Sequence, residues 1–445
     1  MKSHFAGCKT ADELHAKIES RAAQIGVVGV GYVGLPLAVE KAKVGFRVVG
    51  YDRNPARVEQ INRGSSYIAD VSEAELAQAV RDGKFSATSD LSSLGACDVI
   101  IICVPTPLTP NRDPDISYIR HVGAEIAKHL RPGQLVCLES TTYPGTTEEV
   151  LLPLLAATGL VVGQDYFLAF SPERVDPGNQ RYTTRNTNKL VGGVTANCLK
   201  VATQFYRQTI LDVLPVSSPR VAEMTKVFEN TFRAVNIALV NEMALLCERM
   251  KISIWEVIDA AATKPFGMMR FNPGPGVGGH CIPLDPFYLT WKARQYDFST
   301  RFIELAGEIN SLMPYFVRDK VARVLNERGL PLKNAKILAL GVAYKKDIDD
   351  WRESPALKVL ELLERDGAAI DYHDPLVASL QDESGRLRRS VPLTAGALQS
   401  ADCVLILTDH SGIDWSYVVA HAPAIVDTRN ATKGVAAGRE KIVLL

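Results

Sequence analysis

A glycine-rich turn between two apolar runs near the start of the chain constrains the fold more than any other feature. The run Ile25–Gly29 leads into Gly29-Val-Gly-Tyr-Val-Gly34, and a helical pattern then continues to Val44. A second apolar run, Phe46–Tyr51, ends directly before Asp52. Strand, glycine spacing, helix, strand and acid in this order predict a parallel βαβ unit whose turn holds the pyrophosphate of a dinucleotide.

The same unit predicts which dinucleotide binds. We expect cofactor contacts from Gly29, Gly31, Tyr32, Val33, Gly34, Asp52 and Arg53. A carboxylate at the end of the second strand accepts a hydrogen bond from a ribose 2′-hydroxyl and repels a 2′-phosphate. Asp52 therefore favours NAD over NADP, although the adjacent Arg53 is the kind of cation that accommodates a 2′-phosphate.

The alternation of strands and helices continues beyond this unit. Further strands are expected at residues 97–105, 135–142, 166–173 and 190–194. Polar side chains stand where three of these strands end, and ligands bind at the carboxyl ends of parallel strands. We expect ligand contacts from Thr106, Ser140, Thr141 and Glu173, and a turn or cap role is the alternative for each hydroxyl.

Near Ser217 the pattern changes to long helices. One helix is predicted from Pro219 to Lys251, and its apolar residues cover so much of its circumference that we expect it to be buried between domains or subunits. Lys226 and Asn230 lie four residues apart, hence on one face. A solvated lysine is the alternative to a functional one. A second helix is predicted at 300–327, with Pro314 as a kink.

The stretch from Pro273 to Pro286 places four glycines, at 274, 276, 278 and 279, before Cys281. Glycines allow close approach of the backbone and positive φ angles. Asp285 and Pro286 predict an N-cap and a first-turn proline of a helix that runs to Arg294. Cys281 would then precede a helix N-terminus, where a thiolate is favoured. A buried structural cysteine is the alternative.

After Pro331 a second α/β unit is predicted, with strands at 336–343, 369–373, 404–407 and 424–427 and a helix at 354–365. It has no GxGxxG after its first strand. A longer charged segment, Tyr344–Arg352, stands there instead. A second nucleotide with different phosphate handling fits this segment, and a solvated loop is the alternative.

These patterns predict the fold class and the domains. The chain of 445 residues is too long for one ordinary core. We expect an α/β protein in which two Rossmann-like, doubly wound domains are joined by a central helical domain with a long helix. The expected segments are a helical leader at 1–23, an NAD-binding domain at 24–216, a central dimerisation domain carrying the cysteine loop at 217–330, and a second Rossmann-like, nucleotide-binding domain at 331–445.

Composition excludes several classes of protein. Net charge is zero and the charges are mixed, so no basic stripe indicates nucleic acid. No apolar run is long enough to cross a membrane, and the N-terminal sequence has no apolar signal core, so we expect no membrane contact and a cytoplasmic location. The eight cysteines form neither a CxxC nor a zinc pattern, so reduced thiols and no metal are expected.

A nicotinamide site, a reactive thiol and a lysine on an apolar helix together indicate an oxidation that continues past the aldehyde. A thiol captures the aldehyde as a thiohemiacetal, a second hydride leaves, and water cleaves the resulting thioester. Lys226 would stabilise negative charge on oxygen. Asp285 would orient or deprotonate water, unless it is occupied as the helix cap.

The chain resembles the nucleotide-sugar dehydrogenases, the UDP-glucose/GDP-mannose dehydrogenase family, from about Gln24 to the C-terminus. The resemblance lies in an ordered set of motifs: Gly29–Gly34, Val104–Pro107, Ser140-Thr141, Ser171-Pro-Glu173, Lys226–Asn230, Gly278–Cys281 with Asp285, Tyr344–Asp347 and Arg352–Ser354. It implies NAD as the cofactor, UDP bound by the C-terminal domain, and a homodimer or higher homo-oligomer formed through the long helix.

The resemblance also implies residue roles. Cys281 is the nucleophile, and Lys226 and Asn230 hold the C6 oxygen. Thr141 and Asp285 position water, and Glu173 lies at the sugar. Further contacts are implied for Arg174, Arg270, Gly278, Tyr344 and Lys345 with the substrate and for Ser140, Thr106 and Arg352 with the cofactor. Two departures are a proline, Pro177, where the family often has an acid, and the unusual spacing of Arg270 from the cysteine.

The segment around the cysteine also bears on the sugar. Gly-Gly-His280-Cys281-Ile-Pro-Leu-Asp285-Pro286 differs from the GGSCFPKD form of UDP-glucose enzymes and is similar to the branch that acts on UDP-N-acetylhexosamines. Lys264–Gly267, the leader at Leu14–Glu19 and the segment Phe287–Arg294 are most similar to UDP-N-acetylglucosamine 6-dehydrogenases, which implies a role in making surface polysaccharide precursors.

Several alternatives stay open at this point. The same chemistry on UDP-N-acetylmannosamine or UDP-glucose is the nearest one. A two-electron hydroxyacid dehydrogenase of the 6-phosphogluconate type would need neither Cys281 nor a second nucleotide domain. A non-catalytic sensor of NAD or sugar nucleotides would not need the set of Cys281, Lys226 and Asp285.

Overall fold

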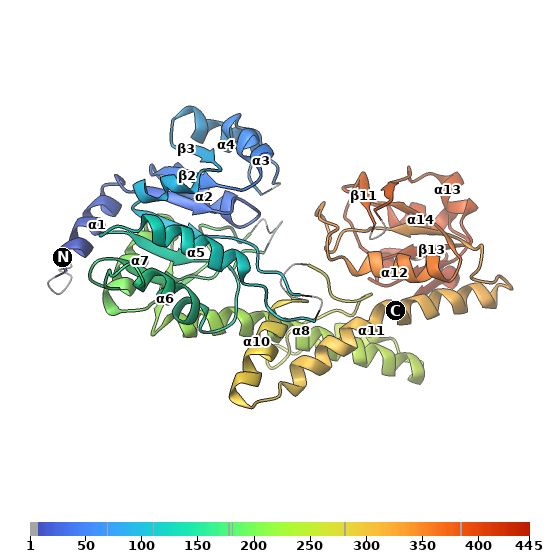
Figure 1. Ribbon diagram of the computed structural model, residues 1–445. Coiled ribbons are helices and arrows are strands. Elements are labelled where there is room, and N and C mark those ends of the chain that lie inside the picture. The colour runs from blue at the N-terminus through green and yellow to red at the C-terminus, as the bar shows by residue number, and fades with distance from the viewer. Residues whose placement is uncertain are drawn as a thin grey trace. The chain divides into compact units, whose positions relative to one another are not determined.

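The computed structural model describes residues 8–68, 70–109, 111–176, 179, 181–279, 282–382 and 385–445. The chain forms two compact units. The first contains the residues up to Glu229 together with Phe287–Phe298, and the second contains Asn230–Pro286 together with Ser299–Leu445. Each unit holds a sheet flanked by helices, and long helices lie between these sheets in the sequence, which confirms the predicted fold class (Figure 1).

The sheet of the first unit has the strand order β3-β2-β1-β4-β5-β6-β7-β8. All neighbouring strands are parallel except β6 and β7, which are antiparallel. The expectation of parallel strands is therefore wrong for β7 relative to β6. The strands are β1 (Gln24–Val28), β2 (Arg47–Tyr51), β3 (Phe85–Thr88), β4 (Val99–Ile102), β5 (Leu135–Leu138), β6 (Phe167–Phe170), β7 (Lys189–Gly193) and β8 (Val213–Val216).

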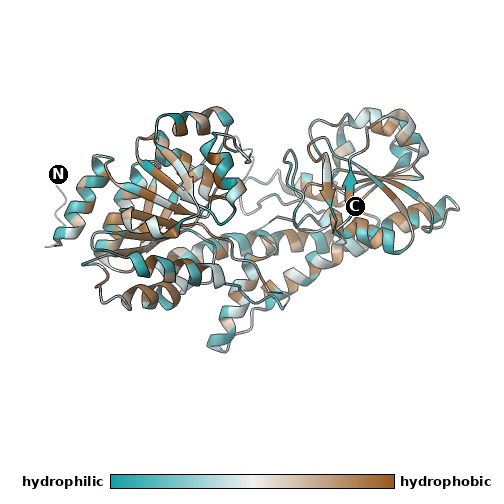
Figure 2. Ribbon diagram, turned by 45° about the horizontal axis from the view of Figure 1, so that its top comes forward, coloured by the Kyte–Doolittle hydropathy of each residue, from teal (hydrophilic) through white to brown (hydrophobic). Residues whose placement is uncertain are grey.

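Helices cover both faces of this sheet because its strands are apolar on both sides. Val99 and Ile101 of β4 join one core cluster, whereas Ile100 and Ile102 join another. The strands accordingly form a largely hydrophobic layer (Figure 2). The helices are α1 (Lys9–Glu19), α2 (Gly34–Lys43), α3 (Pro55–Asn62), α4 (Glu73–Arg81), η1 (Leu91–Ala96), α5 (Ser117–His129), the π-helical turn η2 (Thr147–Leu151), α6 (Leu152–Ala156), α7 (Ala196–Arg207), α10 (Asp285–Ala293) and η3 (Arg294–Tyr296).

Helix α1 packs against α7 through its apolar face. Leu14 and Ile18 are buried in the cluster that contains α2 and α7. The ammonium of Lys17 contacts Asp98 Oδ1 at 2.8 Å, and Asp98 Oδ2 accepts a hydrogen bond from the backbone of Gln24 at 3.0 Å. Helix α1 is therefore a fixed part of the first unit.

The two long helices form close to the predicted bounds. They are α8 (Pro219–Met250) and α11 (Arg301–Glu327), with Pro314 inside α11, and α9 (Ile254–Ala261) lies between them in sequence. Helix α8 passes from the first unit into the second. None of the helices in the described part of the chain has both the length and the apolar character to cross a membrane.

The sheet of the second unit is parallel, with the order β10-β9-β13-β14-β15. Its strands are β9 (Lys336–Leu340), β10 (Ala369–His373), β13 (Cys403–Ile406), β14 (Ile425–Asp427) and β15 (Ile442–Leu444), and β11 (Ser379–Gln381) pairs with β12 (Leu387–Arg389) separately. The helices are α12 (Pro355–Arg365), α13 (Ala395–Ser400), α14 (Trp415–His421), η4 (Ala431–Gly434) and η5 (Arg439–Lys441).

Candidate active site

Each glycine of the turn after β1 is needed for a different structural reason. Gly29 has a φ of +89°, and a Cβ atom there would lie 2.5 Å from the carbonyl oxygen of Cys103. A Cβ atom at Gly34 would lie 1.9 Å from the carbonyl oxygen of Gly29. At Gly31 a Cβ atom would meet no atom within 4 Å. The space at Gly31, before the N-terminus of α2, suits a pyrophosphate that approaches the backbone closely.

Asp52 follows β2 at the same edge of the sheet. Its Oδ1 accepts a hydrogen bond from the backbone of Asn54 at 2.9 Å, and Arg57 Nη1 lies 3.5 Å from Oδ2. The guanidinium of Arg53 lies over the ring of Tyr118, 5.1 Å from its centroid. The carboxylate is thus oriented by its own turn, which suits it to accept a hydrogen bond from a ribose hydroxyl. The exposed side chains of Tyr32 and Val33 stand in the turn after β1.

Three residues predicted to bind a ligand through their hydroxyls, Thr106, Ser140 and Thr141, follow the ends of β4 and β5. Thr106 Oγ1 donates to the carbonyl of Thr141 at 2.6 Å, and Ser140 Oγ donates to the carbonyl of Val104 at 2.8 Å. Tyr288 of α10 donates to the carbonyl of Thr106. No hydrogen bond joins the Thr141 hydroxyl to another described residue. Thr106 and Ser140 therefore tie the loops together, and Thr141 keeps its donor for a ligand.

Glu173 lies beyond β6 with both carboxylate oxygens held. Oε1 accepts hydrogen bonds from the backbone N–H groups of Arg174 and Val175, each at 2.8 Å, and Oε2 lies 3.2 Å from the Lys189 ammonium. Burial raises the pKa of Glu173, but the charge of Lys189 and the backbone donors outweigh burial and hold that pKa below its usual range. Glu173 is therefore an ionised hydrogen-bond acceptor.

Helix α8 carries the next predicted residues. The Arg174 guanidinium pairs with Glu229 at 2.6 Å, so this arginine is oriented by the helix. Lys226 is 8% exposed. No hydrogen bond or ion pair joins the Lys226 ammonium to another described residue. A nearly buried ammonium of this kind is available to an oxygen that gains negative charge.

The second unit brings Asn230 and Asp285 together. The Asn230 amide donates to Asp285 Oδ2, and Asn230 Oδ1 accepts a hydrogen bond from Arg233 at 2.7 Å. Asp285 is 2% exposed. Helix α10 begins at Asp285 itself, so the carboxylate lies in the first turn rather than at the predicted cap position. It is buried, hydrogen-bonded and close in sequence to Cys281.

The glycines before Cys281 let the backbone pack against the loop after β9. A Cβ atom at Gly278 would lie 2.6 Å from Pro355 and 2.8 Å from Tyr344, and one at Gly276 would lie 2.9 Å from Pro355. The backbone N–H of Gly279 donates to the carbonyl of Glu353 at 3.3 Å. The close approach that these glycines predicted is therefore an approach to other residues of the same unit.

Cys281 itself lies outside the described residues, as do His280 and Pro177. The cysteines that the structure describes are all free thiols. Arg270 is exposed and pairs with Asp259 at 2.7 Å, and Asp259 also pairs with Lys433 at 2.6 Å. The described part of the second unit therefore holds Arg270 through a surface ion pair.

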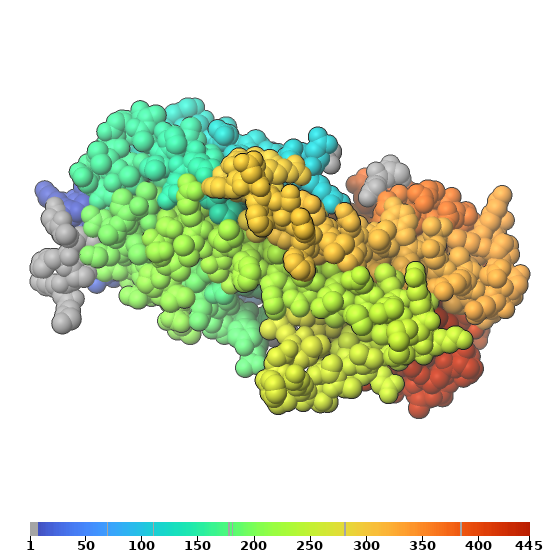
Figure 3. Space-filling model, turned by 90° about the horizontal axis from the view of Figure 1, so that it is seen from below, coloured from blue at the N-terminus to red at the C-terminus, as the bar shows by residue number. Residues whose placement is uncertain are grey.

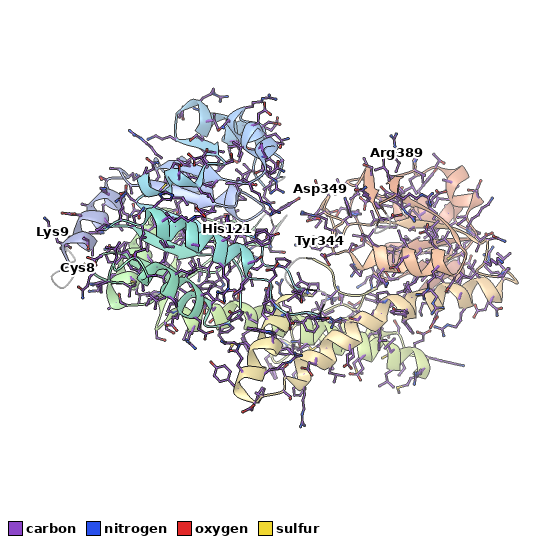
Figure 4. The ribbon with its side chains drawn as sticks, in the orientation of Figure 1. Cys8, Lys9, His121, Tyr344, Asp349 and Arg389 are labelled. Carbon is purple, nitrogen blue, oxygen red and sulfur yellow. The ribbon has the colours of Figure 1, made fainter. Side chains whose placement is uncertain are left out.

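The loop after β9 carries the predicted UDP contacts Tyr344 and Lys345. Figure 4 shows Tyr344 and Asp349 on this loop, whereas Arg389 lies elsewhere in the same unit. Arg352 forms a two-point ion pair with Asp350, with distances of 2.9 and 2.8 Å. The carboxylate of Asp347 accepts hydrogen bonds from the backbone and the hydroxyl of Ser411, each at 2.7 Å.

Two residues that fix this loop were missed in the sequence. Asp374 follows β10, as Asp52 follows β2, but it accepts hydrogen bonds from the backbone of Val342 at 2.7 Å and of Ala343 at 3.2 Å. His410 Nε2 lies 3.1 Å from Asp374 Oδ2, and Nδ1 accepts from the backbone of Asp347 at 3.1 Å. The repeated strand-then-acid pattern is the signal that would have found Asp374. This acid binds its own loop, so it is not open to a ribose hydroxyl in the way expected for Asp52.

Comparison with known proteins identifies the family of the chain. Three domain profiles of one family, the UDP-glucose/GDP-mannose dehydrogenase family, match the chain: the NAD binding domain at residues 23–210, the central domain at 220–312 and the UDP binding domain at 338–434.

Individual relatives match over most of their length. A UDP-N-acetyl-D-mannosamine dehydrogenase of Pyrococcus horikoshii is 36% identical over 92% of this chain and 96% of its own. A UDP-N-acetyl-D-glucosamine 6-dehydrogenase of Pseudomonas aeruginosa is 36% identical over 80% of this chain and 83% of its own. The solved structure of the P. horikoshii enzyme covers 95% of this chain and 98% of its own at 34% identity, with a TM-score of 0.85. The chain therefore belongs to the UDP-glucose/GDP-mannose dehydrogenase family and is an NAD-dependent UDP-sugar dehydrogenase.

Proposed function

We propose that the chain oxidises the C6 hydroxyl of a UDP-N-acetylhexosamine, UDP-N-acetylglucosamine first, to the uronic acid in two steps. The observation that carries the proposal is the buried pair of Asn230 and Asp285, because it joins an amide donor and a carboxylate in the same unit as the segment that bears Cys281. NAD, when bound at the glycine turn, accepts a hydride in each step.

The second oxidation needs covalent chemistry from the protein. In the first step the alcohol becomes an aldehyde. The thiolate of Cys281 then adds to the aldehyde carbon and forms a thiohemiacetal, which loses the second hydride to become a thioester. Water adds to the thioester, and the C–S bond breaks to release the acid and the thiol. The product is a carboxylic acid, and two hydrides leave per sugar.

The roles of the neighbouring residues follow from where negative charge and protons move during the reaction. Lys226 and Asn230, one helical turn apart on α8, stabilise negative charge on the C6 oxygen. Asp285 deprotonates or orients the attacking water, and Thr141 holds that water with its free hydroxyl donor. Glu173 accepts a hydrogen bond from the sugar or from the water. Remaining contacts are assigned to Arg174, Arg270, Gly278, Tyr344 and Lys345 with the substrate and to Thr106, Ser140 and Arg352 with the cofactor.

The choice of sugar rests on sequence patterns and relatives. The His280–Pro286 and Lys264–Gly267 segments favour UDP-N-acetylglucosamine, and relatives named for that substrate occur in P. aeruginosa and Salmonella typhi. Relatives named UDP-N-acetyl-D-mannosamine dehydrogenase are equally similar, at 36% and 35% identity in P. horikoshii and Escherichia coli. UDP-N-acetylmannosamine is therefore the second candidate, and UDP-glucose is the third.

The same proposal includes a homodimer or higher homo-oligomer formed through α8. Large apolar side chains exposed on α8 recur three, four or seven residues apart, which places them along one side of the helix. They are Val221, Met224, Phe228, Phe232, Leu239, Met243, Leu246 and Met250. Figure 3 shows atoms of α8, in yellow-green, open on one face of the molecule. Exposed apolar area of this extent is typical of a protein interface. A monomer in sedimentation at micromolar concentration would contradict the oligomer.

The division at 23, 216 and 330, the cytoplasmic location and a role in polysaccharide precursor synthesis stay predictions. One experiment tests the proposed reaction. The purified protein is incubated with NAD and, separately, UDP-N-acetylglucosamine, UDP-N-acetylmannosamine and UDP-glucose, and NADH and product mass are measured. We expect the highest kcat/KM with UDP-N-acetylglucosamine and a product heavier by 14 mass units, since CH2OH becomes COOH. A kcat/KM for UDP-glucose that equals or exceeds it would overturn the choice of sugar.

A further inference from the structure

A buried ion network lies behind Glu173, and the reaction scheme above does not use it. The Lys189 ammonium contacts Glu139 Oε2 at 2.6 Å and Glu173 Oε2 at 3.2 Å. The Tyr206 hydroxyl donates to Glu139 Oε1 at 2.5 Å. The side chains of Lys189 and Glu139 are 4% and 0% exposed, whereas that of Glu173 is 16% exposed. One buried cation is therefore shared by two carboxylates, and of the two only Glu173 reaches solvent.

The inverted strand β7 brings this lysine to the ligand edge of the sheet. Lys189 is the first residue of β7, and β7 is antiparallel to β6, with Phe170 opposite Gly192. The same register, continued three residues further, places Glu173 opposite Lys189. In a parallel arrangement the first residue of β7 would lie at the other edge of the sheet, away from the carboxyl ends of β5 and β6.

The two carboxylates differ in how readily they hold a proton. Burial raises the pKa of Glu139 and outweighs its contact with Lys189, so Glu139 holds a proton more readily than an ordinary glutamate. The pKa of Glu173 is shifted the other way, as described above. Burial lowers the pKa of Lys189, but the charges of Glu139 and Glu173 outweigh burial and raise it. The lysine is therefore charged, and its charge is available to Glu173.

Glu173 has one hydrogen-bond acceptor position that no group in the described part of the chain occupies. A carboxylate has about four acceptor positions. Two backbone N–H groups and the Lys189 ammonium occupy three of them, one of these on Oε2. The free position on Oε2 can accept a hydrogen bond from a hydroxyl group, provided that the carboxylate stays ionised and does not rotate.

We propose that Lys189 is a positioning residue of the reaction: it keeps Glu173 ionised and fixes its orientation, so that Oε2 accepts a hydrogen bond from a sugar hydroxyl or from the attacking water. This inference rests on the proposed function, in which Glu173 lies at the sugar. Lys189 acts through Glu173 and does not itself touch the substrate. The titratable groups around Lys189 and Glu173 are Glu139 after β5, Tyr206 on α7, Cys137 on β5, Cys103 after β4 and Lys41 on α2.

The test is the pH dependence of kcat/KM in Glu139→Gln variants, in which the second carboxylate beside Lys189 has been replaced by a neutral amide. Glu139→Gln keeps an acceptor for Tyr206 and Lys189, and its profile should match that of the unmodified enzyme. Adding Lys189→Met removes the positive charge beside Glu173. Burial then becomes the main influence on the Glu173 pKa, so this pKa rises. The acid limb should then move to higher pH by about one unit or more, which is about a tenfold loss of kcat/KM at a pH on that limb. Lys189→Arg should restore most of the loss.

Two controls separate positioning from loss of stability. Lys320→Met removes a lysine of the second unit that is 5% exposed and pairs with Glu248 at 3.2 Å, so it should lower stability without moving the acid limb. In a Glu173→Gln background, Lys189→Met should cause no further loss of kcat/KM. A full further loss there, or an unshifted acid limb in Glu139→Gln/Lys189→Met, would overturn the inference. A Glu173→Gln enzyme that is as active as the unmodified one would instead overturn the assigned role of Glu173.

Discussion

The side-chain amide of Asn230 donates a hydrogen bond to the carboxylate of Asp285, although 55 residues separate them in the sequence. Arg233 donates in turn to the Asn230 oxygen, so the amide has a fixed orientation and can only present its N–H groups to Asp285. The pair is buried, since Asn230 is 1% and Asp285 is 2% exposed. A carboxylate held this way suits a base that must act on one water molecule.

Asp285→Asn should therefore remove the base while it keeps an oxygen that can accept the Asn230 hydrogen bond. We expect kcat to fall by about 10²–10⁴-fold, the usual contribution of a general base, with NAD affinity unchanged. Steady-state NADH formation and NAD titration measure the two quantities. Asp297→Asn is the matched control, because Asp297 is exposed beyond the same helix with a φ of 52°, which asparagine adopts readily. A kcat within a few-fold of normal for Asp285→Asn would contradict the role.

Cys281→Ser should abolish turnover to the acid. A hydroxyl barely ionises, whereas a thiol with a pKa of about 8.5 is already a few per cent thiolate near neutrality. The unmodified enzyme should form two NADH per sugar with little free aldehyde, and the variant should bind both ligands but stall. NADH stoichiometry and product mass measure this. Cys8→Ser, in the leader, should behave normally. Acid formed by Cys281→Ser at close to the normal rate would exclude covalent catalysis by this thiol.

Lys226→Ala should lower kcat by about 10²–10³-fold, the typical cost of losing one donor at a developing negative charge. NAD affinity should not change, because the glycine turn and Asp52, the residues expected to hold the dinucleotide, are left intact. Lys43→Ala on α2 is the control, since Lys43 forms only surface ion pairs with Glu40 and Glu75. If Lys226→Ala turns over normally, Lys226 is an ordinary helix lysine.

Asp52→Ala should weaken NAD much more than NADP, because the carboxylate accepts from the ribose 2′-hydroxyl and repels a 2′-phosphate. Asp52→Asn keeps an acceptor oxygen without the charge, so it should retain more NAD affinity than Asp52→Ala and also improve NADP. Kd values for both dinucleotides, measured by fluorescence titration, check this. If the unmodified enzyme turns over NADP at a rate equal to or above that for NAD, the assignment of Asp52 to the ribose 2′-hydroxyl is wrong.

Asp374 should make the stability of the second unit depend on acid pH. Burial raises its pKa, but hydrogen bonds from His410 and from backbone N–H groups outweigh burial and lower the pKa from 3.8 to about 2. The folded pKa is below the unfolded one, so the stabilisation is present above pH 4 and is lost as the pH falls toward 2. It amounts to about 2 kcal/mol.

Urea unfolding of the unmodified protein and of Asp374→Asn at a series of pH values tests this dependence. The difference in unfolding free energy should shrink by about 2 kcal/mol between pH 5 and pH 2. Asp371→Asn, an exposed change on β10, should follow the unmodified protein. A difference that stays constant with pH would contradict the prediction.

The sequence patterns predicted those features that depend on residues close together in the chain. The turn at Gly29–Gly34 and the acid at Asp52 follow from backbone geometry, and α8 begins at the predicted Pro219 because proline suits a first helical turn. The apolar runs located six of the strands in the first unit. The direction of β7 was not predictable, because a strand buried along its whole length reads the same in either direction.

Side-chain contacts between residues far apart in the sequence could not be predicted from the spacing of residues along the chain. Nothing near Lys189 indicates that it meets Glu139 and Glu173, because that meeting depends on the inversion of β7. The proximity of Asn230 and Asp285 likewise depends on tertiary packing, and only the resemblance to a known family suggested a shared site. The glycines before Cys281 correctly predicted a close approach, but the sequence could not show that the partner is Tyr344 and Pro355.

That close approach has a consequence for building hybrid enzymes. A C-terminal domain taken from a relative and joined at residue 331 would bring a foreign surface against Gly276 and Gly278, where Pro355 and Tyr344 leave no room for a Cβ atom. A donor domain that carries bulkier side chains in place of Tyr344 or Pro355 would then clash with the backbone at these two glycines, whatever sugar the new domain recognises. Exchange should succeed only when the second unit, Asn230–Pro286 with Ser299–Leu445, is transferred whole. Under the proposed function, such a transfer would exchange the sugar-binding residues of the second unit together with Cys281.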